Sequence, residues 1–253
     1  MVMRIAIVGG TGTLGRHVVT ELTGRGHDVR ALSRNGEYRV DLTTGEGLSK
    51  ALDGCAAVVD ASNAASAKRA VQVLVEGSRR LLAAEQQAGV GHHVCVSIVG
   101  CDRVSMGYYK VKVDQEHVVE HGPVPWSIVQ ATQFHELVAA ALAAAAKLKV
   151  LPVPRMQLQT IAAAEVAQAV ADVAERAAVN GRVQVAGPRV NTARDLALTW
   201  RRITGRRALL VPVPVPGKLG RALRDGGLTA GRSDIRGTVS FSDWLGAQQG
   251  TGA

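Results

Sequence analysis

Residues 4–22 read RIAIVGGTGTLGRHVVTEL. The apolar run at 4–8 is typical of a buried strand, and the segment at 16–22 has the spacing of an amphipathic helix. The glycines between them follow a G-x-x-G-x-x-G spacing. Glycine accepts a positive φ and has no Cβ, so the main chain can turn sharply and a diphosphate can approach the amides at the helix start. The order strand, glycine loop, helix therefore predicts a dinucleotide site, the alternative being an ordinary glycine-rich βα turn. The residues expected to line it are Gly9, Thr11, Gly12, Thr13, Leu14 and Gly15.

Around this loop the chain alternates short apolar runs with longer helix-like segments, which is the pattern of repeated βαβ units. Strands are expected near 3–8, 28–32, 56–61, 93–98, 126–130 and 182–186. Helices are expected near 13–24, 66–88, 109–121, 134–146 and 163–177. The predicted fold class is α/β, a doubly wound parallel (Rossmann) sheet buried on both faces.

The residue pattern changes after about residue 150, where proline-spaced segments, with proline at every second position, occur at 151–154 and 211–216. Proline has no N–H to donate, so these segments cannot be central strands, and they indicate a small lobe. We expect a single domain over 1–253 with its core sheet in 1–150 plus 163–187. The discontinuous C-terminal substrate lobe is then expected at 151–162 and 188–246.

Composition narrows the class of protein. The 253 residues are 47% hydrophobic, enough for a large core. The alanine-rich run at 137–146 ends at lysines and is too short to span a membrane, and the start of the chain does not read as a signal peptide. Three cysteines without a C-x-x-C pair suggest neither disulfides nor a zinc ribbon. These features predict a cytoplasmic protein with no membrane partner.

The net charge of +9 is densest after Arg201. Such charge can attract nucleic acid, acidic partners or phosphate-bearing ligands, but scattered arginines also form ordinary solvated surfaces. Aromatic residues make up only 3% of the chain, which leaves few side chains on which bases could stack. No nucleic-acid partner is expected.

The end of the second expected strand indicates which dinucleotide binds. An Asp or Glu at this place would hold the ribose 2′-hydroxyl of NAD, and the chain instead has Ser33, Arg34 and Asn35. A guanidinium is a planar, permanently charged donor suited to a 2′-phosphate. The sequence favours NADP over NAD, and the alternative is a solvent-facing arginine.

Two further segments are expected to line the cofactor. Asp41 could accept a hydrogen bond from the adenine amino group while Leu42 packs on the ring, although Asp is also a common turn residue. The small residues Ala61, Ser62 and Asn63 follow the next strand, where the main chain would pass close to the ribose.

Candidate chemistry lies in the stretch from 97 to 112. Tyr108 and Lys112 have the i, i+4 spacing that places two side chains on one helix face. A neighbouring ammonium favours the phenolate, so we expect Lys112 to make proton exchange by Tyr108 easier, and also to bind the nicotinamide ribose. Ser97 ends a strand, where it could orient a substrate carbonyl. The alternative for Tyr108 and Lys112 is an amphipathic surface.

These residues together resemble a known family. The glycine loop, SR at 33–34, SIVG at 97–100, YYKVK at 108–112 and ATQFHE at 131–136 resemble the atypical short-chain dehydrogenase/reductases, specifically NmrA-like NAD(P)-binding proteins. The resemblance covers nearly the whole chain. It implies a Rossmann fold with a small substrate lobe, and a nicotinamide lying near Lys112 and the loop that contains Thr132.

Substrate contacts are expected from Met106 and Phe134, which could wall an apolar pocket or simply fill the core. His135 follows Phe134 and is expected to face the substrate, where an imidazole could donate a hydrogen bond, although a histidine at a helix start often has no function. His117 and His121 have the spacing of two zinc ligands but lack a third, so no metal site is expected.

The sequence therefore predicts an NADP-dependent oxidoreductase that transfers hydride to or from a small carbonyl, quinone or enone. Two alternatives remain open. One is a regulatory protein that senses NADP(H) without turnover, and the other is an epimerase or isomerase that keeps NAD(P) bound. The expected partner is a small-molecule substrate, and the chain is expected to be a monomer or homodimer.

Overall fold

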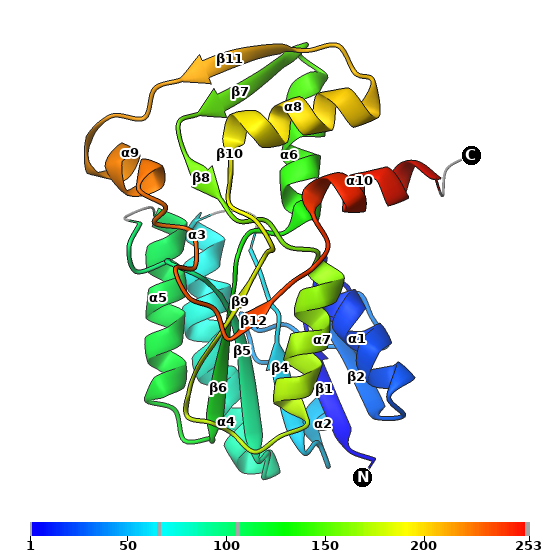
Figure 1. Cartoon of the computed structure of the whole chain (residues 1–253). Helices are drawn as coiled ribbons and strands as arrows, with labels where there is room; N and C mark the ends of the chain where they lie inside the picture. The colour runs from blue at the N-terminus through cyan, green and yellow to red at the C-terminus, as the bar shows by residue number, and fades with distance from the viewer. Residues whose placement is uncertain (1, 65–66, 105–106, 251–253) are drawn as a thin grey trace. The chain divides into compact units, whose positions relative to one another are not determined.

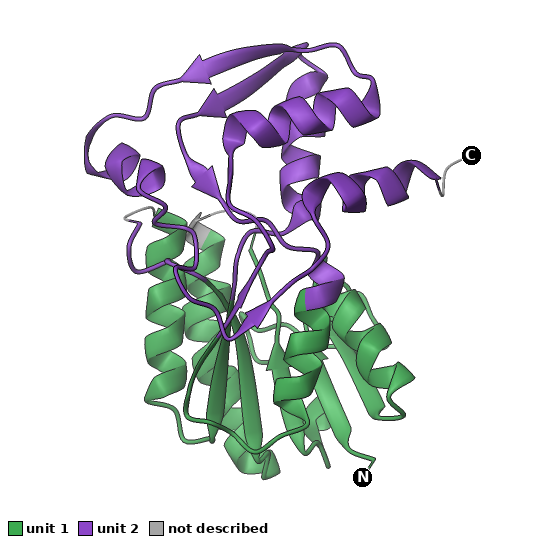
Figure 2. Cartoon of the chain, viewed as in Figure 1, with its two compact units in different colours: residues 1–98, 107–130, 166–183 green, residues 99–106, 131–165, 184–253 purple. Residues whose placement is uncertain are grey.

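A computed structural model describes residues 2–64, 67–104 and 107–250. The chain divides into two compact units, shown in different colours in Figure 2. Unit 1 comprises residues 1–98, 107–130 and 166–183. Unit 2 comprises residues 99–106, 131–165 and 184–253.

The main sheet has eight strands in the order β12-β9-β6-β5-β4-β1-β2-β3. Their bounds are β1 Arg4–Val8, β2 Asp28–Ser33, β3 Tyr38–Arg39, β4 Ala57–Asp60, β5 His92–Ile98, β6 Trp126–Ala131, β9 Gly181–Ala186 and β12 Ile235–Arg236. The pairs β1–β2, β1–β4, β2–β3, β4–β5 and β9–β12 are parallel. From β1 the chain winds outward in both directions, so the predicted doubly wound sheet is confirmed. All six expected strands form within one or two residues of their predicted ends.

Two layers of helices accompany the sheet of unit 1 (Figure 1). The helices are α1 Gly15–Gly24, α2 Leu48–Leu52, α3 Ala67–Ala70, the π-helical turn η1 Val71–Glu76, α4 Gly77–Ala88, α5 Gly107–Glu120 and α7 Ala163–Ala174. α1 and α7 lie side by side, because Arg25 after α1 forms ion pairs with Asp172 at 2.7 Å and Glu175 at 2.8 Å. The second layer holds α4 and α5, with α2 packed on α4. Coverage on both faces explains why the central strands β1 and β4 are mostly apolar and buried.

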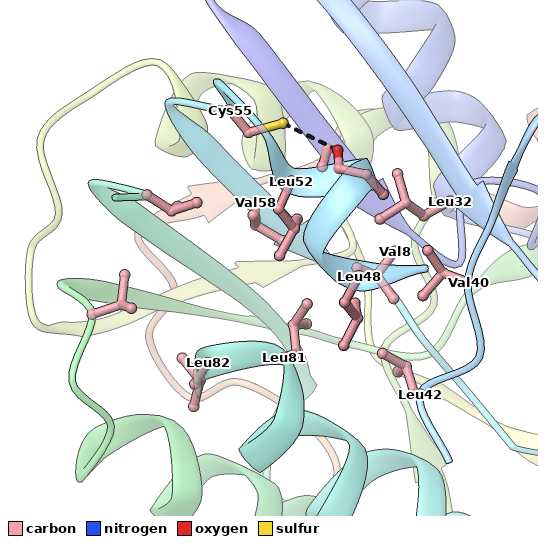
Figure 3. Packing of buried hydrophobic residues seen from close by; sticks show 14 of the residues in the cluster. Val8, Leu32, Val40, Leu42, Leu48, Leu52, Cys55, Val58, Leu81 and Leu82 are labelled. Atoms are coloured by element: carbon pink, nitrogen blue, oxygen red, sulfur yellow. Dashed lines mark hydrogen bonds between the residues drawn. The ribbon is translucent and has the colours of Figure 1, made fainter. Parts of the chain in front are cut away.

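The core of unit 1 lies where β1, β2 and β4 meet helices α2 and α4 (Figure 3). Leu52, Val58 and Leu81 are fully buried there. The Cys55 thiol lies in the same cluster and donates a weak hydrogen bond, 3.6 Å long, to the carbonyl of Ala51. Burial raises the pKa of this thiol, so Cys55 behaves as an apolar core residue.

Unit 2 contains the proline-spaced segments, and they pair with each other. β7 Val150–Pro154 and β11 Leu209–Val213 form a two-stranded parallel sheet, as expected for segments that cannot be central strands. The other elements are α6 His135–Ala146, β8 Gln157–Leu158, β10 Asn191–Thr192, α8 Ala193–Thr204, α9 Gly217–Arg224 and α10 Phe241–Gly250. Within the described ranges, no helix has the length and apolar character that crossing a bilayer requires.

The boundary of unit 2 differs from the expected start of the lobe near residue 151. Helix α6, which the sequence analysis placed with the core sheet, belongs to unit 2 and packs on β7 and α8. Its residue Leu142 is buried in the same cluster as Trp200 and Phe241. The reason is compositional: α6 is alanine-rich around its whole circumference, so its sequence does not show which neighbour it covers.

Candidate cofactor site

The glycine loop needs glycine for packing as much as for conformation. Gly9 has a φ of +73°, and a Cβ there would lie 2.8 Å from the carbonyl oxygen of Ala61. A Cβ on Gly15 would lie 2.1 Å from the carbonyl oxygen of Gly9. Helix α1 and the end of β4 therefore approach the loop more closely than any side chain permits.

The loop presents amides that have no partner in the described structure. The backbone N–H groups of Thr11, Thr13, Leu14 and Gly15 donate no hydrogen bond to any described residue. No side chain caps the N-terminus of α1, whose N-cap residue is Leu14. Free amides at the positive end of a helix bind a diphosphate without a charged side chain, so these residues fit the predicted group.

The residues at the end of β2 and just after it include a polar group without a partner in the described structure. Arg34 and Asn35 are exposed, and the Ser33 hydroxyl is buried without a hydrogen-bond partner. An unbonded buried hydroxyl is unfavourable in the free protein, and a ligand oxygen would relieve it. These three residues could hold the phosphate that distinguishes NADP from NAD.

Asp41 and Leu42 make contacts within the protein that the sequence does not show. The Asp41 carboxylate accepts hydrogen bonds from the Thr43 N–H at 2.8 Å and the Thr43 hydroxyl at 2.7 Å. These bonds hold the pKa of Asp41 below its ordinary value, with a smaller contribution from the charge of Arg34. Leu42 is only 7% exposed and packs in the core of Figure 3, which differs from the expected stacking on adenine.

The segment after β4 is tied to helix α5. The Ser62 N–H donates to the buried Asp60 carboxylate at 2.9 Å, and the Ser62 hydroxyl is buried without a partner. Asn63 is exposed, and its Oδ1 accepts a hydrogen bond of 2.6 Å from the hydroxyl of Tyr108. Ala61 is half-buried beside the glycine loop. The structure thus brings Tyr108 together with the predicted ribose-lining segment.

Lys112 takes part in a buried chain of hydrogen bonds. The residue is 3% exposed, and its ammonium donates to the carbonyl of Val96 at 2.7 Å and to Gln115 Oε1 at 2.6 Å. The Gln115 amide donates onward to the Asp60 carboxylate at 3.0 Å. Gln115 was not among the predicted site residues, although its i, i+3 spacing from Lys112 was a usable signal. An ammonium has three N–H donors, so one remains after these two bonds.

Tyr108 differs from expectation in its acidity. The phenol is half-buried, and burial together with the neighbouring Tyr109 raises the pKa of Tyr108 to about 12. The prediction that Lys112 lowers this pKa is wrong, because the ammonium is engaged by Val96 and Gln115 instead of approaching the phenol. Tyr108 is therefore protonated at neutral pH.

Ser97 also has a partner that the sequence did not reveal. Its hydroxyl donates to the carboxylate of Glu116, which is only 3% exposed. The same carboxylate accepts from the Gln130 amide at 2.9 Å and from Arg182 Nε at 3.1 Å. No hydrogen bond joins Ser97 to Tyr108 or Lys112 in the described structure. The expected role in orienting a carbonyl conflicts with this placement, because the hydroxyl proton is already donated.

The remaining predicted residues belong to unit 2, except that Met106 lies outside the described residues. Thr132 is 2% exposed and accepts a hydrogen bond from the Gly187 N–H at 3.1 Å. Phe134 is half-buried at the N-cap position of α6.

The expectation that His135 faces the substrate is wrong. The side chain is fully buried, with its ring centroid 5.5 Å from that of Phe241 and 5.7 Å from that of Trp244. Burial lowers the pKa of His135, and its Nε2 lies 3.1 Å from the Val239 carbonyl. His135 is a core residue because α10 packs over it.

Comparison with known proteins adds relatives of several kinds. Photosystem II assembly factor Ycf39 of Synechocystis sp. is 38% identical over 111 residues, covering 38% of this chain and 34% of that protein. A short-chain dehydrogenase/reductase superfamily protein of Agrobacterium tumefaciens with bound NAD has a TM-score of 0.75 at 19% identity, covering 98% of this chain and 96% of its own. The NADPH-dependent quinone oxidoreductase of Escherichia coli, complexed with NADPH, has a TM-score of 0.76 at 17% identity, covering 97% and 99%. At these identities the structural likeness concerns the fold.

A family model matches a larger part of the chain than the curated relative does. The model described as NAD(P)H-binding matches residues 9–177, which include the glycine loop, the ends of β2 and β4, and helix α5. The chain belongs to this NAD(P)H-binding family, in agreement with its resemblance to the atypical short-chain dehydrogenase/reductases.

Proposed function

We propose that the chain is an NADP-dependent oxidoreductase that transfers hydride to or from a small carbonyl, quinone or enone. One observation carries the proposal: a phenol that stays protonated at neutral pH, Tyr108, is held by Asn63 at the same carboxyl edge of the sheet as the glycine loop. Ligands of open parallel sheets bind beyond that edge.

Bound NADPH would supply the hydride, and the protein would manage position and proton. Tyr108 donates its proton to the substrate oxygen that becomes negative, which favours the reductive direction because the phenol carries a proton at neutral pH. Lys112 places a buried positive charge near that edge and has one N–H left for a ribose hydroxyl. Gln115 and Asp60 position the ammonium through their hydrogen bonds.

The preference for NADP is proposed to depend on Arg34. Replacing Arg34 by Gln removes a charge-assisted bond to the 2′-phosphate, which weakens NADPH binding by about tenfold or more and leaves NADH binding unchanged. Arg39→Gln is the matched control, since Arg39 is an exposed arginine five residues further on. Fluorescence titration of all three proteins with NADPH and NADH gives the affinities. Equal loss for both nucleotides, or equal loss in the control, contradicts the assignment.

Turnover is tested with a panel of quinones, aldehydes and enones at saturating NADPH. Replacing Tyr108 by Phe removes the proton donor and should lower kcat by about 100-fold or more while the affinity for NADPH is retained. An unchanged kcat in this variant refutes the role of Tyr108.

A second candidate function is NADP(H) sensing, in which the chain binds the nucleotide without turnover and passes this signal to a protein partner. Two observations favour it: the Ser97 hydroxyl is bonded to Glu116, and the curated relative from Synechocystis is an assembly factor. This chain spans only about a third of that relative's length. Tight NADPH binding with no NADPH consumed on any of the quinones, aldehydes and enones would select this function. An epimerase would instead convert its substrate without net consumption of the nucleotide.

A further inference from the structure

Unit 2 contains a cavity of about 200 Å³ that none of the predicted site residues lines. Helix α8 contributes Leu196, Thr199 and Arg202, which share one helix face because they are three residues apart. The first two residues of α10 and Ser240 just before them also line the cavity, and the segment before α8 contributes Arg189. Every residue of the lining belongs to unit 2, whereas the glycine loop and the end of β2 belong to unit 1.

Two arginines give the cavity its charge. The side chains of Arg189 and Arg202 are exposed, and neither guanidinium forms an ion pair or hydrogen bond with any other described residue. By contrast, Arg25 and Arg182 each bind two or more carboxylates. Arg189 and Arg202 are therefore available to a ligand of opposite charge.

The acidic residues in the first turns of α8 and α10 already have partners. Asp243 in the first turn of α10 accepts a hydrogen bond of 2.6 Å from the Ser240 hydroxyl. Asp195 in the first turn of α8 caps that helix through Thr192. Neither carboxylate is part of the cavity lining, so the charged groups that line it are positive.

A buried hydroxyl provides an independent sign of a missing ligand. Thr160 lines the cavity and is only 2% exposed, and its Oγ1 has no hydrogen-bond partner within the described structure. Buried polar atoms without a partner are rare in folded proteins, and each requires an explanation. A hydroxyl can donate to a ligand oxygen, as the two guanidinium groups can.

The volume limits the size of the ligand. A water molecule occupies about 30 Å³ in the liquid, so the cavity holds roughly seven waters. Sites for drug-sized molecules and cofactors span roughly 300–1,000 Å³, so this cavity is smaller than the sites that usually hold a dinucleotide.

We propose that this cavity binds a small oxyanion, a phosphate or a compact carboxylate, with Arg189 and Arg202 as charged donors and Thr160 as a neutral donor. The planar guanidinium matches both kinds of anion by paired N–H donors. The dipole at the N-terminus of α10 adds favourable potential for the same charge. The site is separate from the proposed dinucleotide site and does not depend on it.

Isothermal titration calorimetry of the full chain in a low-salt zwitterionic buffer tests the proposal, with inorganic phosphate in one arm and succinate in the other. We expect saturable binding in at least one arm, and the anion with the higher affinity identifies the ligand class. The double variant Arg189→Gln/Arg202→Gln should weaken binding about tenfold or more, and Thr160→Val several-fold. Arg207→Gln, at an exposed arginine outside the lining, should leave the affinity unchanged.

Amide ¹H–¹⁵N spectra recorded during the titration locate the anion. Shifts at residues 189–191 and 240–242 support the proposal. No saturable heat with either anion up to about 10 mM overturns it. Shifts confined to residues 11–15 that persist in the double variant overturn it as well, because the anion then binds the glycine loop.

Discussion

Replacement of Gly15 by Ala tests the link between packing and cofactor binding. The new Cβ would lie 2.1 Å from the carbonyl oxygen of Gly9 and 2.8 Å from the Cα of Gly10. Side-chain Cβ atoms keep at least 3.0 Å from such atoms, so the helix and loop must separate by almost 1 Å. Both neighbours are main-chain atoms, and no rotamer change can relieve the clash.

The expected loss follows from this geometry. Overpacking of a close-packed site costs about 1–3 kcal/mol in the free energy of unfolding, which lowers the Tm by about 2–4 °C per kcal/mol for a chain of this size. The displacement also moves the free amides of Thr13 and Leu14 away from the diphosphate. We expect the affinity for NADPH to fall by about tenfold or more, since each lost charge-assisted bond is worth about 1.5–3 kcal/mol.

Gly24→Ala at the other end of the same helix is the matched control. A Cβ at Gly24 meets no atom within 4 Å, so this variant should be as stable as the parent or more stable by about 0.5–1 kcal/mol. Urea unfolding and fluorescence titration with NADPH measure both quantities on all three proteins. If Gly15→Ala unfolds and binds like Gly24→Ala, the proposed close approach of loop and helix is refuted.

Two further predictions concern buried networks. Ser97→Ala removes one of the hydrogen bonds to the buried Glu116 carboxylate, while the Gln130 amide still donates to the same oxygen, so the free energy of unfolding should fall by about 1–3 kcal/mol while kcat/KM stays within about threefold; a large loss of kcat/KM at unchanged stability would restore a catalytic role for Ser97. The fully buried His93 lies 2.9 Å from Glu85, and although burial lowers the pKa of His93, the Glu85 carboxylate raises it well above its ordinary value. The folded chain then binds the His93 proton more tightly than the unfolded chain does. The stabilisation that results from this proton is complete below about pH 6.5 and is lost as pH rises through the pKa of His93 in the folded chain. In Glu85→Gln the raising effect of the carboxylate is lost and burial is opposed only by Cys95, so the pKa of His93 should fall and the loss of stability with rising pH should shrink or disappear; urea unfolding across about pH 5–9 that shows the same slope in both proteins would contradict this assignment.

The strand order along the chain could be read from sequence because each strand is a local pattern. Apolar runs such as 4–8 and 126–130 are short, rich in β-branched residues and bounded by glycine or proline, and these signals do not depend on the rest of the fold. The proline spacing near 151–154 and 211–216 likewise excluded those segments from the centre of the sheet. It did not show that they pair with each other.

The candidate site was harder to predict because a side chain's role depends on its neighbours. Helical spacing correctly placed Tyr108 and Lys112 on α5, but it does not show how deeply a side chain is buried or which groups it bonds. Lys112 is 3% exposed and bonded to Val96 and Gln115, so its charge does not act on the phenol as expected. His135 became a core residue because α10, more than a hundred positions later, packs on its ring.

The amino-acid sequence alone determined that this chain forms a doubly wound sheet with a glycine loop for a dinucleotide, because strand and helix periodicity and glycine's missing Cβ are local properties. Tertiary structure alone decided which polar groups are satisfied and which remain open. Gln115 links Lys112 to Asp60, Glu116 accepts from Ser97, and the Thr160 hydroxyl has no described partner beside two arginines that form no ion pair with any described residue. Hydrogen bonds and burial between residues far apart in the chain arise only on folding, so these arrangements follow from the packing of elements and not from any one segment.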